Sequence, residues 1–384
     1  MTRWRVWPGE SGVVTGERAT TGTRRDGSPP PRVLLLVLDG LSPRHVDPPV
    51  MPVLSDLARR GGWWPEGGLG VLPSSTYPNH ATLVTGVPPS RHGLLANEMP
   101  SPDGPVPAWE LGLSAATLFD SMRSAGRPSA AVFGDHHLVG ATGAAAADSV
   151  WPPGGSVPDV ALDVLGYAKD RETTARMVEV IAGGSELIVA QLNEPDTAAH
   201  IFGPDSAEAL DRYGRTDACL GVIVEAIRPR WEEWVIVVVS DHSQEPVLDP
   251  DPVDLRSAAV RLGRQVRVVD DGAAAVVEET PAGDDDWLRT VPGVEDLVRL
   301  DDRTVLVWAH PGRWFSPAAY PIRGVHGSPR TAPQVAVVTG GHPGASALGA
   351  AVTARRPRST DWAGAVAGLL GIPVPAGLAP PGSR

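Results

Sequence analysis

Three consecutive hydroxyl side chains precede a predicted helix in the segment LPSSTYPNHATLVTG, residues 72–86. Any of Ser74, Ser75 and Thr76 could act as a nucleophile if a metal ion or a base lowers the pKa of its hydroxyl. The same residue types are also favoured helix N-caps, and Pro78 suits a first helical turn. The other polar residues of the chain must therefore decide between a nucleophile and a cap.

Aspartate and histidine residues recur where a turn or a helix can aim them at one point. Asp196 and His200 in EPDTAAH are four residues apart, which places both on one face of a helix. Asp241 and His242 are adjacent and directly follow an apolar run. Carboxylate oxygens and imidazole nitrogens together suit zinc or another divalent metal of similar character. The full set of candidate ligands is Asp39, Asp196, His200, Asp241, His242 and His326.

Most of these candidate ligands lie at the ends of continuous apolar runs, which are typical of buried parallel strands. Such runs cover residues 32–40, 186–196, 234–243 and 334–340. Helical patterns lie between them at residues 51–60, 78–85, 115–125, 171–182 and 206–227. The alternation predicts an α/β fold with a mostly parallel central sheet and helices on both faces. Ligands bind outside the carboxyl ends of strands in such sheets, so we expect a site there.

Two segments differ from this core in composition. Residues 1–30 are charged, lack apolar periodicity and end in a proline run, which predicts a disordered tail. Residues 252–304 are dense in acidic residues and contain a hairpin signal at Asp271-Gly272, which predicts a small α+β insertion. The core is then expected to comprise residues 31–251 and 305–384.

The composition argues against several classes of protein. The 384 residues carry a formal net charge of −12, which disfavours a nucleic-acid backbone as the partner. Cys219 is the only cysteine, so no disulfide can form within the chain. No apolar run reaches the ~18 residues that a membrane span needs, and the N-terminal segment lacks the apolar region of a signal peptide. We therefore expect a cytoplasmic protein.

Several motifs, in their order along the chain, resemble those of the nucleotide pyrophosphatase/phosphodiesterase family in the alkaline phosphatase superfamily. They are LDGL, STYPNHATLVTG followed by SRHGLLAN, NEPDTAAHIFGPDS, VVVSDH, HPGRWF and GVHG. The resemblance covers roughly residues 32–375 and implies an alkaline-phosphatase-like fold. It also implies a hydrolase that cleaves phosphodiester or pyrophosphate bonds in a small phosphate ester, with nucleotides among the candidate substrates.

The same resemblance implies roles for individual residues. Thr76 matches the family's nucleophile, and Asn79 matches the residue that donates a hydrogen bond to a phosphoryl oxygen. The reaction would run in two steps, through a phosphothreonine that water then hydrolyses. Two divalent metal ions, expected to be zinc, would assist. The implied ligands are Asp196, His200 and His326 for one ion, and Asp39, Asp241, His242 and the Thr76 oxygen for the other.

Two departures from the family pattern bear on the substrate. Ser75 stands where many relatives have a lysine, and Ser328 follows His326-Gly327 where relatives often have a tyrosine. A neutral residue beside the nucleophile favours a singly charged diester over a dianionic monoester, although Arg323 weakens that argument. A phosphomonoesterase or a phosphonate hydrolase on the same scaffold remains the alternative enzyme. An inactive relative used as a binding module remains the alternative outside catalysis.

The roles of four further residues stay open. His136 and His137 in FGDHHLVG could form a third metal site, but a pair on the surface or in a substrate cleft is favoured. Tyr77 follows the candidate nucleophile and Phe202 lies close after His200. Either ring could stack on a nucleotide base or pack in the core. The sequence does not determine the oligomeric state.

Overall fold

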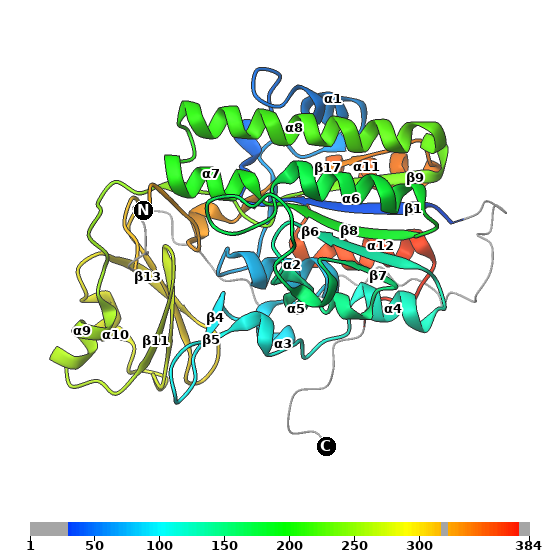
Figure 1. Ribbon diagram of the computed structural model, residues 1–384. Coiled ribbons are helices and arrows are strands. Elements are labelled where there is room, and N and C mark those ends of the chain that lie inside the picture. The colour runs from blue at the N-terminus through cyan, green and yellow to red at the C-terminus, as the bar shows by residue number, and fades with distance from the viewer. Residues whose placement is uncertain (1–29, 316–321, 376–384) are drawn as a thin grey trace.

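The computed structural model describes residues 30–315 and 322–375, and its centre is a seven-stranded sheet (Figure 1). The strands of this sheet are β1 Arg32–Leu38, β2 Gly62–Trp63, β6 Ser129–Phe133, β7 Ser149–Trp151, β8 Leu187–Leu192, β9 Trp234–Val239 and β17 Ala336–Thr339. Their order is β2-β17-β9-β1-β8-β6-β7. The strands from β9 to β7 run parallel, whereas β17 pairs antiparallel with both of its neighbours. The predicted mostly parallel sheet is confirmed.

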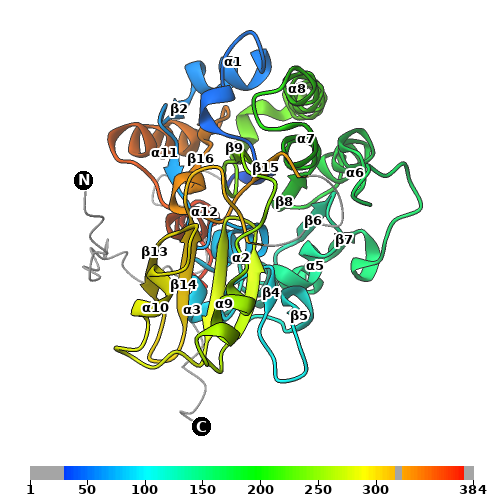
Figure 2. The ribbon, with the colours of Figure 1, turned by 90° about the vertical axis from the view of Figure 1, so that its left-hand side faces the viewer.

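Helices cover both faces of the sheet, as the sequence predicts (Figure 2). One face carries α1 Pro52–Arg60, α6 Asp170–Ala182 and α8 Ala207–Ile227, and the other carries α2 Thr76–Thr85, α4 Leu118–Ser124, α11 Pro343–Ala354 and α12 Ser359–Leu370. Alternate side chains of β1 point to opposite faces of the sheet. Leu34 packs with the first set of helices, and Val33 packs with the second. β1, which is apolar from Val33 to Leu38, is therefore buried on both sides.

Part of this core has no clear signal in the sequence. β6 and β7 have the sequences SAAVF and SVW, which are too short and too rich in small residues to show a strand pattern. α11 is built largely of Ala and Gly, so it lacks a distinct polar face. The apolar run at 334–340 does form a strand, but β17 is antiparallel to β9. An apolar run indicates that a strand is buried on both faces, but it does not indicate whether the strand runs parallel or antiparallel to its neighbours.

The insertion folds into a four-stranded antiparallel sheet. Its strands are β11 Arg267–Asp271, β12 Ala274–Glu278, β13 Val294–Arg299 and β14 Val305–Ala309, in the order β11-β12-β14-β13. The predicted hairpin at Asp271-Gly272 joins β11 and β12, and Gly272 has a φ of +66° that suits such a turn. α9 Leu255–Arg261 and α10 Asp286–Arg289 pack on this sheet. β14 completes the sheet, so the predicted boundary at residue 304 falls inside it.

Shorter elements complete the described chain. The paired short strands are β3 Gly68–Leu69 with β16 Pro333–Gln334, β4 Glu98–Met99 with β5 Val106–Pro107, and β10 Glu245–Pro246 with β15 Gly324–Val325. The other helices are α3 Pro89–His92, α5 Leu138–Ala141 and α7 Glu194–Phe202, with 3₁₀ turns at Pro43–His45, Ala108–Glu110, Ala144–Ala146, Pro153–Gly155, Arg228–Glu233 and Pro329–Thr331.

Within residues 30–315 and 322–375, no helix has the length and apolar character that crossing a membrane requires. The predicted tail, apart from Pro30, lies outside the described residues, as do residues 316–321 and 376–384.

Candidate functional site

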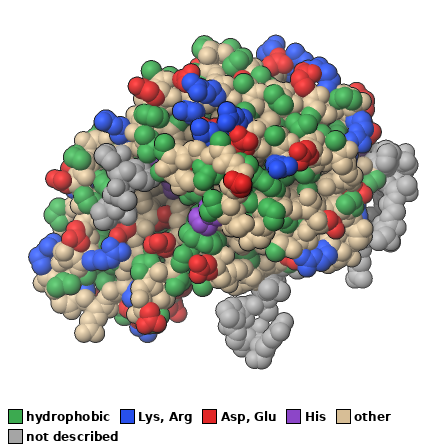
Figure 3. Space-filling view, viewed as in Figure 1, with side chains coloured by type: hydrophobic (Ala, Val, Ile, Leu, Met, Phe, Trp, Pro, Cys, Tyr) green, Lys and Arg blue, Asp and Glu red, His purple; other side chains and the backbone are tan. Residues whose placement is uncertain are grey.

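The carboxyl ends of three adjacent strands bring the candidate ligands together. β9, β1 and β8 are neighbours in the sheet, and Asp241, Asp39 and Asp196 follow these strands in the same order. Gly40 allows α7 to approach closely, because its φ is +67° and a Cβ there would lie 2.8 Å from Asp196 Oδ1. A hollow between the insertion and the main sheet shows histidine side chains (Figure 3). The structure therefore gathers these residues at the edge of the sheet that the sequence indicates.

Asp196, His200 and His326 form one group, with ligand atoms within 4.8 Å of one another. Asp196 and His200 lie one turn apart on α7, and His200 Nε2 is 3.4 Å from Asp196 Oδ1. The other ring nitrogen of His200, Nδ1, is 2.8 Å from the carbonyl oxygen of Gly324, to which it can donate. That bond leaves Nε2 as an acceptor directed at the group, which is the form of histidine that binds a metal ion.

Asp39, Asp241 and His242 form a second group that adjoins the first. His242 Nε2 lies 3.3 Å from Asp241 Oδ2 and 3.7 Å from Asp39 Oδ1. Gln191 donates to Asp39 Oδ2 at 2.7 Å, and the backbone N–H of Gly40 donates to Asp241 Oδ1 at 3.1 Å. One oxygen of each carboxylate is thus held in place. The other oxygen is buried and has no hydrogen-bond partner among the described residues.

His80 also lies at this second group, although the sequence does not single it out as a ligand. It forms a candidate metal-binding set with Asp39 and Asp241, and its Nδ1 is 3.4 Å from Asp241 Oδ2. The same nitrogen is 2.9 Å from the carbonyl oxygen of Thr76, one turn earlier in α2. The four-residue spacing from Thr76 is the signal in the sequence that could have placed His80 beside the site.

No lysine or arginine among the described residues balances the negative charge of these groups. Asp39, Asp196 and Asp241 form ion pairs only with histidines in the part of the chain that the structure describes. Burial and the adjacent Asp241 raise the pKa of Asp39 well above its usual range. Burial and the adjacent His242 lower the pKa of His326 well below its usual range, which keeps that ring neutral. Buried carboxylates beside neutral imidazoles fit divalent cations.

Thr76 is the first residue of α2, and its hydroxyl faces the second group. Thr76 Oγ1 lies 3.3 Å from His242 Nε2. The two hydroxyls before it have other positions: Ser74 donates to the carbonyl oxygen of Ser328 at 2.6 Å, and Ser75 is the N-cap residue but makes no capping bond with its side chain. The capping role that the sequence allowed is therefore not realised by the side chain of Ser75.

Asn79 does not reach the site, which corrects its assignment as the phosphoryl donor. Its Nδ2 donates to the carbonyl oxygens of Pro73 at 3.2 Å and Ser75 at 3.0 Å, and its Oδ1 accepts from the N–H of Val71 at 2.9 Å. The side chain is fully buried. Asn79 therefore holds the loop that precedes α2, and its amide is not available to a ligand.

Asn97 lies at the site instead, although its place in the sequence does not single it out. Asn97 Oδ1 accepts the backbone N–H of Tyr77 at 3.0 Å, so the amide sits at the N-terminus of α2 beside Thr76. No described residue accepts a hydrogen bond from its Nδ2. Asp271 in the insertion accepts the backbone N–H of Asn97 at 3.3 Å. Asn97 is the last residue of the SRHGLLAN motif, which is the one signal in the sequence that could have pointed to it. Only the folded loop shows that Asn97 lies beside Thr76.

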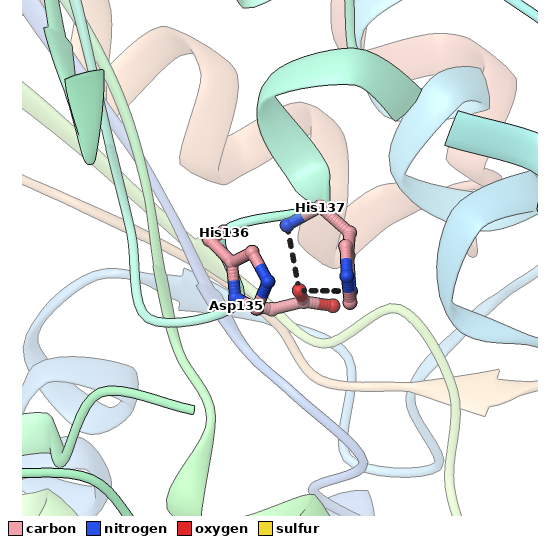
Figure 4. A group of neighbouring side chains, drawn as sticks. All are labelled: Asp135, His136 and His137. Carbon is pink, nitrogen blue, oxygen red and sulfur yellow. Dashed lines mark hydrogen bonds and ion pairs between the residues drawn. The ribbon is translucent and has the colours of Figure 1, made fainter. Parts of the chain in front are cut away.

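The loop after β6 brings His136 and His137 to the same edge of the sheet, beside Asp135. The ligand atoms of these three residues lie within 4.8 Å of one another, as Figure 4 shows. Tyr77 is 4% exposed and its hydroxyl donates to Asp135 at 3.1 Å, so its ring is a packing element and not a stacking platform. Phe202 is 40% exposed at the end of α7, so its ring remains accessible.

A mostly parallel sheet that carries buried Asp and His groups beside a threonine at a helix N-terminus is the arrangement that the resemblance to the alkaline phosphatase superfamily implies. The family model described as Type I phosphodiesterase / nucleotide pyrophosphatase matches residues 33–307. The chain belongs to this family.

Curated relatives and solved structures agree with this placement. A venom phosphodiesterase of Macrovipera lebetinus is 28% identical over an alignment of 191 residues that covers 46% of this chain and 21% of the relative. Ectonucleotide pyrophosphatase/phosphodiesterase family member 1 of Rattus norvegicus is 26% identical over 228 residues, 56% of this chain and 24% of the relative. The matches thus span less than a quarter of these relatives' length.

Two solved structures share the fold. An inactive threonine-to-alanine variant of murine ectonucleotide pyrophosphatase/phosphodiesterase 5, in complex with AMP, has a TM-score of 0.67 at 17% identity and covers 90% of this chain and 96% of that chain. Phosphonoacetate hydrolase from Sinorhizobium meliloti, in complex with phosphonoacetate, has a TM-score of 0.65 at 19% identity and covers 91% and 98%. At this identity the similarity shows the fold alone.

Proposed function

We propose that the chain hydrolyses phosphodiester or pyrophosphate bonds of a small phosphate ester, with Thr76 as nucleophile and two divalent metal ions as cofactors. A nucleotide is the proposed substrate class. The observation that carries the proposal is the position of Thr76 Oγ1, at a helix N-terminus and 3.3 Å from His242. Beside it lie buried oxygens of Asp39 and Asp241 that have no hydrogen-bond partner among the described residues. A helix N-terminus offers N–H groups and a positive dipole end to a phosphate.

The two Asp/His groups are the proposed ligands of the metal ions, which we expect to be zinc. Bound ions would neutralise the phosphoryl charge and lower the pKa of the threonine hydroxyl. Carboxylate and imidazole donors match zinc. One buried oxygen of Asp39 and one of Asp241 have no hydrogen-bond partner among the described residues, and a bound cation would stabilise both. One ion is assigned to Asp196, His200 and His326, and the other to Asp39, Asp241, His242 and the Thr76 oxygen.

Thr76 and Asn97 have separate roles in the proposed reaction. The Thr76 hydroxyl gives up its proton to solvent as its oxygen attacks phosphorus, the P–O bond to the leaving group breaks, and the leaving group departs with a proton from solvent. The phosphoryl group is then held on Thr76 as an ester. Water attacks the same phosphorus, the P–O bond to Thr76 breaks, and the Thr76 oxygen takes up a proton that this water releases. Asn97 Nδ2 donates to a phosphoryl oxygen, since its Oδ1 is fixed on the N–H of Tyr77 and its amide nitrogen is left to face a ligand. Such a fixed donor stabilises the charge that develops in the transition state.

The comparisons support this proposal. The matched family is described by phosphodiesterase and nucleotide pyrophosphatase activities, and one solved relative holds AMP. That relative is inactive with a threonine replaced by alanine, which supports a threonine nucleophile here. A phosphonate hydrolase shares the fold to a similar degree, so the fold does not separate the proposed activity from its alternative.

A substrate panel with a matched pair of variants tests the proposal. The panel comprises a nitrophenyl nucleotide diester, nitrophenyl phosphate and phosphonoacetate, each with chelator and with added zinc. Thr76→Ala should lower kcat/KM for the diester by at least about 10³-fold, because the covalent route is closed. It should leave metal content and melting temperature nearly unchanged. Ser75→Ala should keep most activity. A dead Ser75→Ala beside an active Thr76→Ala would refute the assignment of the nucleophile.

A further inference from the structure

A third group of metal-ligating side chains lies in the loop that follows β6, apart from the two groups already assigned. Asp135, His136 and His137 are consecutive, and Figure 4 shows the Asp135 carboxylate beside the two imidazole rings. Asp135 Oδ1 is 3.2 Å from His137 Nδ1. The ring centroids of the two histidines are 3.9 Å apart. Three donor side chains thus converge on one small region.

The burial of this group is costly without a cation. Asp135 is 2% exposed and His136 is 9% exposed. Asp135 forms no ion pair with a lysine or an arginine among the described residues, and its donors are neutral: the Tyr77 hydroxyl at 3.1 Å and the backbone N–H of His137 at 2.9 Å. His136 Nδ1 is buried and has no partner in the same part of the chain. A buried carboxylate normally pairs with a cation or coordinates a metal.

We propose that Asp135, His136 and His137 bind a third divalent transition-metal ion. Two imidazoles and one carboxylate form a ligand set that suits zinc better than magnesium or calcium, which prefer oxygen. Ligands held at ~2.1 Å in a tetrahedral site are about 3.4 Å apart. The 3.2 Å between Asp135 Oδ1 and His137 Nδ1 agrees with this spacing. A simple hydrogen bond would explain that distance, but it would leave the buried nitrogen of His136 without a partner.

The surroundings of the group hold it in the way that outer-shell residues hold metal ligands. The Tyr77 hydroxyl fixes Asp135 Oδ2, and Trp109 stacks on the His137 ring at a centroid distance of 3.8 Å. Gln191 Oε1 accepts the backbone N–H of Asp135 at 3.0 Å, while its amide donates to Asp39 Oδ2 at 2.7 Å. One side chain therefore connects the third group to the second. An ion in the third group would add positive charge on the Tyr77 side of the nucleophile.

Metal content tests this site without reference to activity, so the test stands apart from the proposed function. The full chain is purified, loaded with zinc, freed of excess by gel filtration and measured by mass spectrometry. We expect His136→Ala to hold one equivalent fewer than the unsubstituted protein. His310→Ala, at an exposed position directly after β14, is the matched control and should hold the full number. Equal zinc content in all three proteins would overturn the proposal.

Crystals of the unsubstituted protein give a second readout that needs no variant. An anomalous difference peak at the zinc edge, within bonding distance of Asp135, His136 and His137, would support the third site. Peaks at the other two groups with none at the β6 loop would overturn it and leave the proposed function intact. Absence of peaks from the groups around Asp196 and Asp241 would count against the proposed function, whatever is found at the β6 loop.

Discussion

Asn97 and Asn79 lead to opposite predictions because their amides have different partners. Asn97→Ala removes a fixed donor beside Thr76, so we expect kcat/KM for a diester to fall about 10²-fold with little change in melting temperature. Asn79→Ala leaves buried backbone groups without partners, so the free energy of unfolding should fall by about 1–3 kcal/mol. Steady-state kinetics and thermal unfolding of both variants decide the matter. The reverse pattern would return the donor role to Asn79.

The two asparagines also show what spacing can and cannot predict for single residues. The metal-ligand candidates follow from strand ends and from the four-residue interval between Asp196 and His200, because strands and helices fix the direction of such side chains. Asn79 is three residues after Thr76 in the same helix, yet it faces the loop behind the helix. Asn97 comes from a separate loop, so only tertiary structure brings it to Thr76.

At the scale of elements, the hairpin between β11 and β12 supports the site from the insertion. Gly272 has a φ of +66°, and a Cβ there would lie 2.5 Å from the carbonyl oxygen of His326. The next residue, Ala273, donates its N–H to the same oxygen at 2.7 Å. The sequence predicts this hairpin from its turn residues, but its contact with the His326 loop depends on how the insertion docks, which no local pattern records.

This contact makes Gly272→Ala a test of the docking. The substitution should displace His326 and lower both kcat/KM and zinc affinity by about 10-fold or more, a loss of about 1.4 kcal/mol in each. Gly283→Ala is the matched control, since Gly283 also has a positive φ, +84°, but nothing lies within 4 Å of an added Cβ. Both variants share the strain of about 1–2 kcal/mol for a side chain at positive φ. Similar zinc affinities in the two variants would show that the hairpin does not position His326.

A second junction between elements, at the starts of α6 and α7, predicts a dependence of stability on pH. Asp170 accepts the backbone N–H groups of Asn193 at 2.8 Å and Glu194 at 3.0 Å, just before the Asp196 turn. Burial, followed by the charge of Glu194, raises the pKa of Asp170 to about 7 from 3.8. The folded protein therefore binds a proton that the unfolded chain releases between these values. The contribution of Asp170 to stability is fully present below the lower value and is lost as pH rises through about 7.

Asp170→Asn should remove this dependence while keeping an oxygen for both N–H groups. The free energy of unfolding of the variant, relative to the unsubstituted protein, should rise by about 2–4 kcal/mol between pH 4 and pH 7. Urea unfolding at a series of pH values measures this difference. Asp103→Asn, at an exposed loop position, should give a flat difference curve. A flat curve for Asp170→Asn as well would mean that the carboxyl is ionised throughout.

At the scale of the whole molecule, charge limits which phosphate esters the site can accept. The chain carries a formal net charge of −12, and the aspartates of the site have only histidines as ion-pair partners among the described residues. An anionic substrate is therefore attracted by bound metal ions and repelled by the rest of the molecule. The net negative charge of the protein follows from its composition. Which charged side chains lie at the site depends on the fold.

The repulsion between the negatively charged protein and an anionic substrate favours a diester over a monoester. Ser75 and Asn97 beside Thr76 are neutral, and Arg323 is exposed, with its backbone N–H bound to the carbonyl oxygen of His200 at 2.8 Å. A diester carries one negative charge and a monoester carries two, so the protein repels the monoester more strongly.

We expect kcat/KM for a nitrophenyl nucleotide diester to exceed that for nitrophenyl phosphate by at least ~10-fold, or about 1.4 kcal/mol. Because salt shortens the Debye length from about 30 Å at 0.01 M to 10 Å at 0.1 M, the ratio should narrow as ionic strength rises. Both substrates release the same leaving group, so the ratio reports the charge and the group on the far side of phosphorus. A monoester preference that persists at low salt would contradict the argument and favour the phosphomonoesterase alternative. In that case Arg323→Ala, which removes an exposed cation three residues before His326, should restore the diester preference.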